Sequence, residues 1–194
     1  MVREELGSDQ MRRTLRRLAH EIIEQAGDLR ELALVGIRTR GVTLAERLAG
    51  DIEQLGDIRP PVGALDVTLY RDDLDRAGGA RVRLQKTDLP FSCAGKDIIL
   101  VDDVLYTGRT VRAALAALVN FGRPRRVLLA VAVDRGGREL PVRADYVGRN
   151  LDVRPDEEVQ VLLQESDGRD AIVVQDSPDF KKFRYSPGEV ETNT

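Results

Sequence analysis

Two adjacent aspartates, Asp102 and Asp103, end an apolar run in the segment DIILVDDVLYTGRTVRAAL, residues 97–115. The turn Thr-Gly-Arg-Thr begins four residues later, at Thr107, and leads into a helical stretch. Its backbone N–H groups, two hydroxyls and one guanidinium at a helix N-terminus suit a monoester phosphate. Carboxylates would repel a bare phosphate, but they accept hydrogen bonds from the vicinal hydroxyls of a sugar. The segment therefore predicts a sugar phosphate ligand.

Two other interpretations compete for this segment. The run IILVDD is similar to the acidic strand of a P-loop ATPase, but the chain contains no G-x-x-x-x-G-K-[ST] motif. In the second interpretation, Asp103 only caps a helix and Asp102 faces water. That interpretation leaves the TGRT turn unexplained, so the sugar phosphate is favoured.

The elements around the segment predict an α/β fold. Apolar periodicity indicates helices at 10–26, 42–55 and 110–121, and strands at 32–37, 62–70, 97–101 and 126–133. Short strands are also expected near 146–147, 158–163 and 171–174. Strands alternating with helices indicate a mainly parallel sheet flanked by helices, whose ligands bind beyond the carboxyl ends of the strands. The acid pair follows one such end.

Length and composition narrow the class of protein. The 194 residues suit one domain, with 42% apolar and 32% charged residues, and the net charge of −3 argues against indiscriminate nucleic-acid binding. No apolar run is long enough to span a membrane, and the first 20 residues look helical and arginine-rich rather than signal-like. A cytoplasmic protein is expected. The single cysteine, Cys93, cannot form an internal disulfide and is expected to be inert.

A second basic turn, GIRTRG, also follows a buried strand. Its loop should therefore lie on the same edge of the sheet as the acid pair. Arg38 and Arg40, with the backbone around Thr39 and Gly41, can bind a second anion there. A solvated basic turn remains the alternative.

The decapeptide VDDVLYTGRT resembles the phosphoribosyl diphosphate (PRPP) signature of type I phosphoribosyltransferases: four apolar or small residues, two acids and T-G-x-T. The resemblance implies their fold, in which a central, mainly parallel sheet carries a small hood. It places Asp102 and Asp103 on the ribose hydroxyls and the TGRT turn on the 5′-phosphate. The implied PRPP-binding residues are Thr39, Arg40, Val101, Asp102, Asp103, Val104, Leu105, Tyr106, Thr107, Gly108, Arg109 and Thr110.

Longer stretches resemble one branch of this family, which regulates pyrimidine operons by binding leader mRNA and also converts uracil and PRPP to UMP and diphosphate. They include RLAHEIIE, VGIRTRGVTLAERLA, ALDVTLYRDDL and AVDRGGRELPVRADYVGRN. The resemblance implies a regulator of attenuation that responds to UMP or UTP, assembles as a homodimer or tetramer and uses Mg²⁺. Two alternatives stay open: a salvage phosphoribosyltransferase without an RNA role, and a regulator whose catalysis has decayed.

The resemblance also implies roles for individual residues. Asp102, Asp103 and Arg40 are the expected catalytic residues, with Arg40 on the diphosphate and Mg²⁺ bound through PRPP, water linking it to the acid pair. Asp134 and Arg135 are expected to contact uracil. Tyr70, Arg71, Asp72 and Asp73 resemble a lid loop that closes over PRPP and excludes water.

The expected RNA-binding surface begins on the first helix, where Arg13, Arg16, Arg17 and His20 share the polar face. Taken alone, such a face is usually solvated. The implied RNA contacts are Arg16, Arg17, His20, Arg38, Thr39, Arg143 and Arg149. Two departures adjoin this surface, because Gly137 replaces a histidine of the family and Leu151, Asp152 and Val153 replace a Pro-Thr-Ser type turn. We expect one domain over 1–180 and a flexible tail over 181–194.

Overall fold

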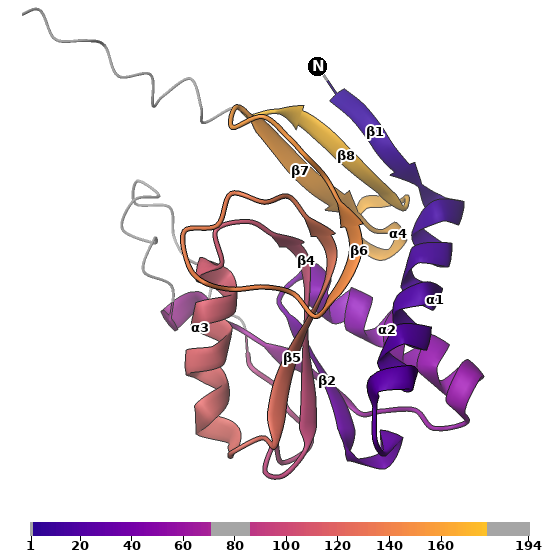
Figure 1. Ribbon diagram of the computed structural model, residues 1–194, viewed down its shortest axis with the longest axis vertical. Coiled ribbons are helices and arrows are strands. Elements are labelled where there is room, and N and C mark those ends of the chain that lie inside the picture. The colour runs from indigo at the N-terminus through magenta and orange to yellow at the C-terminus, as the bar shows by residue number, and fades with distance from the viewer. Residues whose placement is uncertain (1, 71–85, 178–194) are drawn as a thin grey trace, which may run out of the picture.

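The structure, a computed structural model, describes residues 2–70 and 86–177. Its centre is a sheet of five parallel strands in the order β3-β2-β4-β5-β6 (Figure 1). Most of the predicted lid and all of the predicted tail lie outside the described residues. The strands are β2 (Leu32–Ile37), β3 (Val62–Leu65), β4 (Asp97–Leu105), β5 (Arg126–Asp134) and β6 (Tyr146–Asn150).

Helices cover both faces of this sheet. Helices α1 (Ser8–Gln25) and α2 (Arg40–Gly56) lie on one face, and α3 (Arg109–Leu118) lies on the other (Figure 1). Side chains of a strand alternate between its faces, so Leu34 of β2 packs in the core beneath α1 and α2, while Val35 packs beneath α3. The strand LALVGI is apolar throughout because both of its faces are buried.

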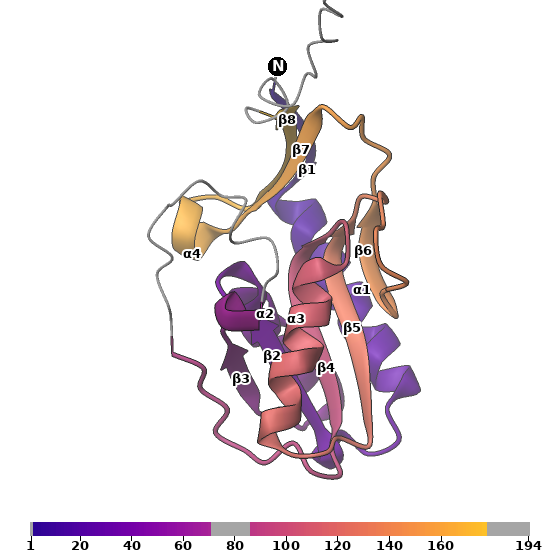
Figure 2. The same ribbon diagram turned by 90° about the vertical axis from the view of Figure 1, so that its left-hand side faces the viewer.

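A second, three-stranded antiparallel sheet forms a hood above the carboxyl ends of the parallel strands (Figure 2). It consists of β1 (Val2–Gly7), β7 (Glu157–Leu162) and β8 (Ala171–Asp176), with β8 in the middle and the short helix α4 (Gln164–Asp167) between β7 and β8. The expectation of a helical N-terminus is wrong for β1. Val2 pairs with Gln175, and a local sequence pattern does not report a partner so far along the chain.

Three predicted element boundaries are also wrong. The strand expected at 62–70 ends at Leu65, because the Asp66 carboxylate accepts the N–H of Thr68 and turns the chain into a 3-10 helix at Thr68–Tyr70. Strand β4 continues through the acid pair to Leu105, where the sequence predicted an end at residue 101. Helix α3 stops at Leu118, and residues 119–121 form a 3-10 turn.

Cys93 is fully buried, and its burial raises the pKa of the thiol. A thiol in such surroundings is unreactive, in line with the expectation from the sequence. Within residues 2–70 and 86–177, none of the helices has the length and apolar character needed to cross a membrane.

Candidate functional site

The predicted ligand loops meet at one edge of the parallel sheet. Gly36 near the end of β2 pairs with Val101 of β4, and Leu105 at the end of β4 pairs with Asp134 at the end of β5. Because these strands run parallel, the loops that follow them emerge side by side. The prediction that the GIRTRG loop and the acid pair lie at the same edge of the sheet is confirmed.

The acid pair lies among the last four residues of β4, close to the turn that leads into α3. Asp102 is 7% exposed and Asp103 is half-buried. The carboxylate of Asp102 accepts the N–H of Asp103 at 3.0 Å, and that of Asp103 accepts the N–H of Val104 at 2.8 Å. The residue that caps α3 is Gly108. The interpretation of Asp103 as a helix cap and Asp102 as a water-facing residue is therefore wrong.

The turn between β4 and α3 depends on Gly108. Its φ of 90° lies in the left-handed region, and a Cβ atom there would come within 3.2 Å of Val142. Thr107 Oγ accepts the N–H of Arg109 at 3.4 Å, so the hydroxyl sits at the first amides of α3. Arg109 itself is held by an ion pair with Glu139, with 2.7 Å between Nη2 and Oε2.

The loop after β2 is brought against the acid pair by Gly41. A Cβ atom on Gly41 would lie 2.3 Å from the carbonyl oxygen of Val101, which immediately precedes Asp102. Only a residue without a side chain allows α2 to begin this close to β4. The start of α2 therefore lies against the backbone of Val101 and Asp102. The peptide bond between Arg38 and Thr39 is cis.

Arg40 has a partner that the sequence did not indicate. Its Nη2 lies 2.9 Å from Oδ1 of Asp167 in the hood. Asp167 also accepts the N–H of Leu163 at 2.9 Å and the hydroxyl of Ser166 at 2.8 Å. These two hydrogen bonds and the Arg40 guanidinium lower the pKa of Asp167 to about 2. The carboxylate is therefore charged at neutral pH.

Arg138 is a second residue that the sequence reasoning missed. Its guanidinium donates to the carbonyl oxygens of Tyr106 at 2.7 Å, Gly136 at 3.1 Å and Val142 at 3.0 Å, and it forms an ion pair with Asp134. One side chain thus ties the phosphate turn to the loop expected to contact uracil. Burial alone would raise the pKa of Asp134, but the bonds from Arg138 and the Gly136 amide lower it.

Gly137, one of the two departures from the family resemblance, lies beside the Tyr106 ring. The Arg135 guanidinium lies 4.1 Å from the centre of the Tyr106 ring, within cation–π range. Gly137 has a φ of 70°, and a Cβ atom there would lie 2.4 Å from the same ring. The Tyr106 ring therefore occupies the space that a side chain at position 137 needs. Asp134 and Arg135 are both at the site edge, and Arg135 faces the phosphate turn.

Tyr70 is the only residue of the predicted lid that falls within the described part of the chain. Its hydroxyl accepts a hydrogen bond from Asn120 at 2.8 Å, and its carbonyl accepts one from Arg112 at 3.1 Å. Tyr70 is therefore anchored on α3 and the turn that follows it. Arg71, Asp72 and Asp73 lie outside the described residues.

The predicted RNA-binding residues do not form one cluster. Arg17 donates to the carbonyls of Val147 and Gly148 at 3.0 and 2.7 Å, and with Arg13 and Arg149 it lines a groove of about 400 Å³ between α1 and β6. The other predicted residues lie elsewhere. Arg16 bonds Gln54 and, together with His20, faces Asp51 of α2. Arg38 bonds the carbonyl of Lys86, Thr39 is in the loop after β2, and Arg143 lies in a hollow beside α3.

Known proteins resemble the chain over most of its length. The family described as "Phosphoribosyl transferase domain" matches residues 4–165. Three curated relatives named "Bifunctional protein PyrR" are 57% identical in Chloroflexus aurantiacus, 55% in Picosynechococcus sp. and 52% in Enterococcus faecalis. The matches cover 87%, 86% and 84% of this chain and 92%, 93% and 91% of the respective relatives.

Two solved structures share the fold. The hypoxanthine phosphoribosyltransferase of Staphylococcus aureus matches with a TM-score of 0.64, covering 92% of this chain and 94% of that protein. The enzyme of Trypanosoma cruzi matches with a TM-score of 0.67, covering 90% and 97%. Both are 19% identical to the chain, so these two likenesses speak for the architecture alone. The predicted type I fold is confirmed.

Proposed function

The chain belongs to the phosphoribosyltransferase family, and on that premise we propose that it is a bifunctional regulator and enzyme. It transfers ribose 5-phosphate from PRPP to N1 of uracil, giving UMP and diphosphate. It also binds the leader mRNA of a pyrimidine operon when UMP or UTP occupies the site. Relatives named bifunctional PyrR, at 52–57% identity over most of the chain, support both halves of this proposal.

One observation carries the catalytic half. Gly41 packs on the backbone of Val101, so the arginine loop, the acid pair and the phosphate turn converge on a single edge. An extended ligand with a phosphate at one end, a diphosphate at the other and hydroxyls between them matches this order. We assign the 5′-phosphate to Thr107–Thr110, the ribose hydroxyls to Asp102 and Asp103, and the diphosphate to Thr39 and Arg40.

The acid pair also suits the magnesium ion that would accompany PRPP. Mg²⁺ prefers oxygen ligands and keeps several waters, and two adjacent carboxylates at this edge, one of them half-buried, fit a hydrated ion. The ion would neutralise charge on the leaving diphosphate. We propose that Asp102 and Asp103 would hold it through water.

The residues themselves account for the remaining chemistry. As the bond to diphosphate breaks, positive charge develops on the sugar and negative charge on the leaving group. The carboxylate of Asp103 stabilises the first, and the guanidinium of Arg40 stabilises the second. Asp134 and Arg135 orient uracil, and Arg138 fixes the loop that carries them. Tyr70, the residue of the predicted lid that the structure describes, is anchored by its bond from Asn120.

For the RNA half, the groove between α1 and β6 is the part of the predicted surface that the geometry favours. Arg13, Arg17 and Arg149 converge there, and although Arg17 also pairs with Glu21, the three guanidiniums together attract a polyanion. Arg16, His20, Arg38, Thr39 and Arg143 would then act outside this groove or not at all. We further propose a cytoplasmic homodimer or tetramer, with one domain over 1–180 and a tail over 181–194.

The catalytic half is tested by incubating the protein with PRPP, Mg²⁺ and uracil and measuring UMP and diphosphate. Uracil should be turned over at least tenfold faster than hypoxanthine or guanine. Comparable turnover of a purine base would refute the uracil assignment, although the solved neighbours in fold are purine enzymes.

The regulatory half is tested by a gel shift with a pyrimidine-operon leader RNA at near-physiological salt. UMP should strengthen binding. If UMP has no effect while UMP synthesis is intact, the protein is a salvage enzyme. That alternative draws support from Arg17 and Arg38, which already bond to backbone carbonyls of the same chain.

A further inference from the structure

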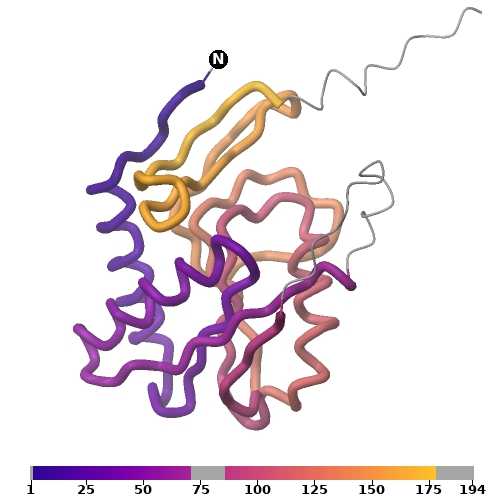
Figure 3. Tube along the Cα trace, turned by 180° about the vertical axis from the view of Figure 1, so that it is seen from behind, coloured from indigo at the N-terminus to yellow at the C-terminus, as the bar shows by residue number. Residues whose placement is uncertain are grey.

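We propose that Asp167 of the hood is a positioning residue for Arg40: its carboxylate occupies the place of an anion on this guanidinium and yields it to the diphosphate of PRPP. The inference rests on the proposed function, since it assumes that Arg40 binds diphosphate. It adds an exchange of partners that couples substrate binding to the hood. Figure 3 shows the loop that carries α4 beside the start of α2.

The Asp167 carboxylate is held in place by other hydrogen bonds besides its contact with Arg40. Asp167 Oδ1 lies 2.9 Å from Arg40 Nη2, and its Oδ2 is fixed by the N–H of Leu163 and the hydroxyl of Ser166. The Arg40 side chain is 37% exposed and that of Asp167 is 20% exposed. Asp167 therefore presents a charged, oriented oxygen to Arg40, the first residue of α2.

Arg40 retains binding capacity that Asp167 does not satisfy. Its Nε is buried and has no hydrogen-bond partner among the described residues. A buried, unpaired donor on a cation is costly, so a ligand that supplies a further acceptor oxygen is favoured over a single carboxylate contact. A diphosphate carries several such oxygens and more charge than one carboxylate.

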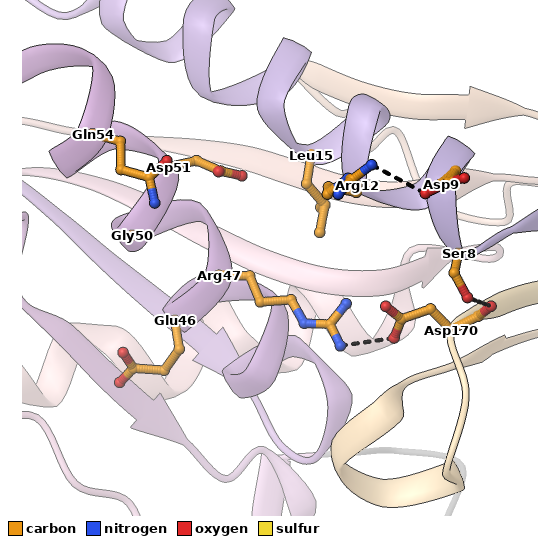
Figure 4. A pocket seen from close by; sticks show the side chains of 10 residues that line it. All are labelled: Ser8, Asp9, Arg12, Leu15, Glu46, Arg47, Gly50, Asp51, Gln54 and Asp170. Atoms are coloured by element: carbon orange, nitrogen blue, oxygen red, sulfur yellow. Dashed lines mark hydrogen bonds and ion pairs between the residues drawn. The ribbon is translucent and has the colours of Figure 1, made fainter.

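A second arginine keeps the hood in place when Arg40 changes partner. Arg47, two turns further along α2, bonds Glu165 through its Nε at 3.0 Å and Asp170 through its Nη2 at 2.7 Å. Figure 4 shows Arg47 reaching from α2 to Asp170, which is also joined to Ser8 at the start of α1. The segment after β7 thus has one fixed attachment, at Arg47. Its other attachment, at Arg40, lies at the edge of the parallel sheet that carries the acid pair, called the ligand edge below.

The pair supplies a matched test within one short helix. Asp167→Asn removes the charge that competes for Arg40, yet its amide oxygen can still accept the N–H of Leu163. Glu165→Gln removes the same charge two residues away, from a side chain that contacts Arg47. Equal thermal midpoints of the two variants establish that both fold. Binding of inorganic diphosphate with Mg²⁺ is then measured by calorimetry for the wild type and both variants.

We expect Asp167→Asn to bind magnesium diphosphate about three- to fivefold more tightly at low salt, the range for exposed ion pairs, while Glu165→Gln stays at the wild-type value. The ratio of the variant's affinity to the wild-type affinity should fall towards one as salt screens the ion pair. UMP, which has no diphosphate, should bind both variants as it binds the wild type. A merely structural role of Asp167 would change UMP binding as well.

Two other outcomes would contradict the proposal. Unchanged or weaker diphosphate binding by Asp167→Asn, with wild-type binding intact, would overturn the exchange and leave the proposed function standing. A wild-type protein that binds neither diphosphate nor PRPP would overturn the proposed function together with this inference.

Discussion

The ligand edge and the groove between α1 and β6 are both rich in arginine, but their charges are balanced differently. At the edge, Arg40, Arg109 and Arg138 each pair with a carboxylate, from Asp167, Glu139 and Asp134 respectively. In the groove, Arg17 pairs with Glu21, whereas Arg13 and Arg149 have no ion pair among the described residues. The groove is lined by Leu6, Gln10, Arg13, Thr14, Arg17, Gly148 and Arg149.

This difference separates two kinds of anion recognition. At the edge, an incoming phosphate competes with carboxylates that already orient the cations, so binding there depends on geometry. In the groove, the cations attract a polyanion by charge, so binding should be strongly salt-dependent. Changes at the edge should therefore alter catalysis or stability sharply, and changes in the groove should alter RNA affinity.

The largest effect is expected from Arg138→Ala at the edge. The change removes the ion pair from Asp134, which keeps only the N–H of Gly136, and takes the Arg138 donor from the carbonyl of Tyr106. We expect a loss of about 3 kcal/mol in the free energy of unfolding. Urea denaturation measures it. Arg138→Lys, which keeps the charge, should recover part of the loss. If the alanine variant is as stable as the wild type, Arg138 does not brace the edge.

Gly137→Ala should be next, at about 2 kcal/mol in the free energy of unfolding. It incurs the cost of a left-handed φ and displaces the Tyr106 ring from Arg135. Gly136→Ala is the matched control, because Gly136 has a φ of 69° with nothing near its Cβ position, and it should cost about 1 kcal/mol. Equal costs for the two variants would show that the ring contact is unimportant.

Asp103→Asn should lower the rate of UMP synthesis at least tenfold, which corresponds to about 1.4 kcal/mol of transition-state stabilisation. The amide keeps the shape of the side chain but removes the negative charge beside the sugar. The thermal midpoint should stay within a few degrees of the wild type. Steady-state kinetics with uracil and PRPP provide the check, and a wild-type rate would remove Asp103 from the catalytic residues.

Arg17→Ala should lower the free energy of unfolding by about 1 kcal/mol, through the lost bonds between α1 and the carbonyls of β6. It should weaken leader RNA and spare UMP synthesis. Arg16→Ala is the control on the same helix, because Arg16 points to Gln54 of α2. If Arg16→Ala weakens RNA more than Arg17→Ala does, the RNA lies across α1 and α2 instead of in the groove.

The site could be predicted where its residues are close in sequence. The acid pair and the TGRT turn lie within nine residues, and the conformation of Gly108 is a local requirement of that turn. The partners of these residues could not be predicted in the same way. Asp167 is 127 positions from Arg40, and Arg138 reaches Leu105 across 33 positions.

The polar face of α1 shows a second reason why contacts could not be predicted from the sequence. Arg13, Arg16, Arg17 and His20 share a side of α1 by periodicity, and the structure divides them. Arg17 turns to β6, while Arg16 and His20 face Asp51 of α2. Periodicity fixes the angle of a side chain around its own helix axis, but the elements packed on either side decide which neighbour it meets.

The parallel sheet, the helices that cover it and the acid pair with its phosphate turn could be predicted, because they follow from local periodicity and from motifs a few residues long. Four features could be seen only in the folded chain: β1 joins the hood, Asp167 holds Arg40, Arg138 braces the turn and Tyr106 fills the space over Gly137. Each of these is a contact between distant segments, and such contacts exist only after the whole chain has packed.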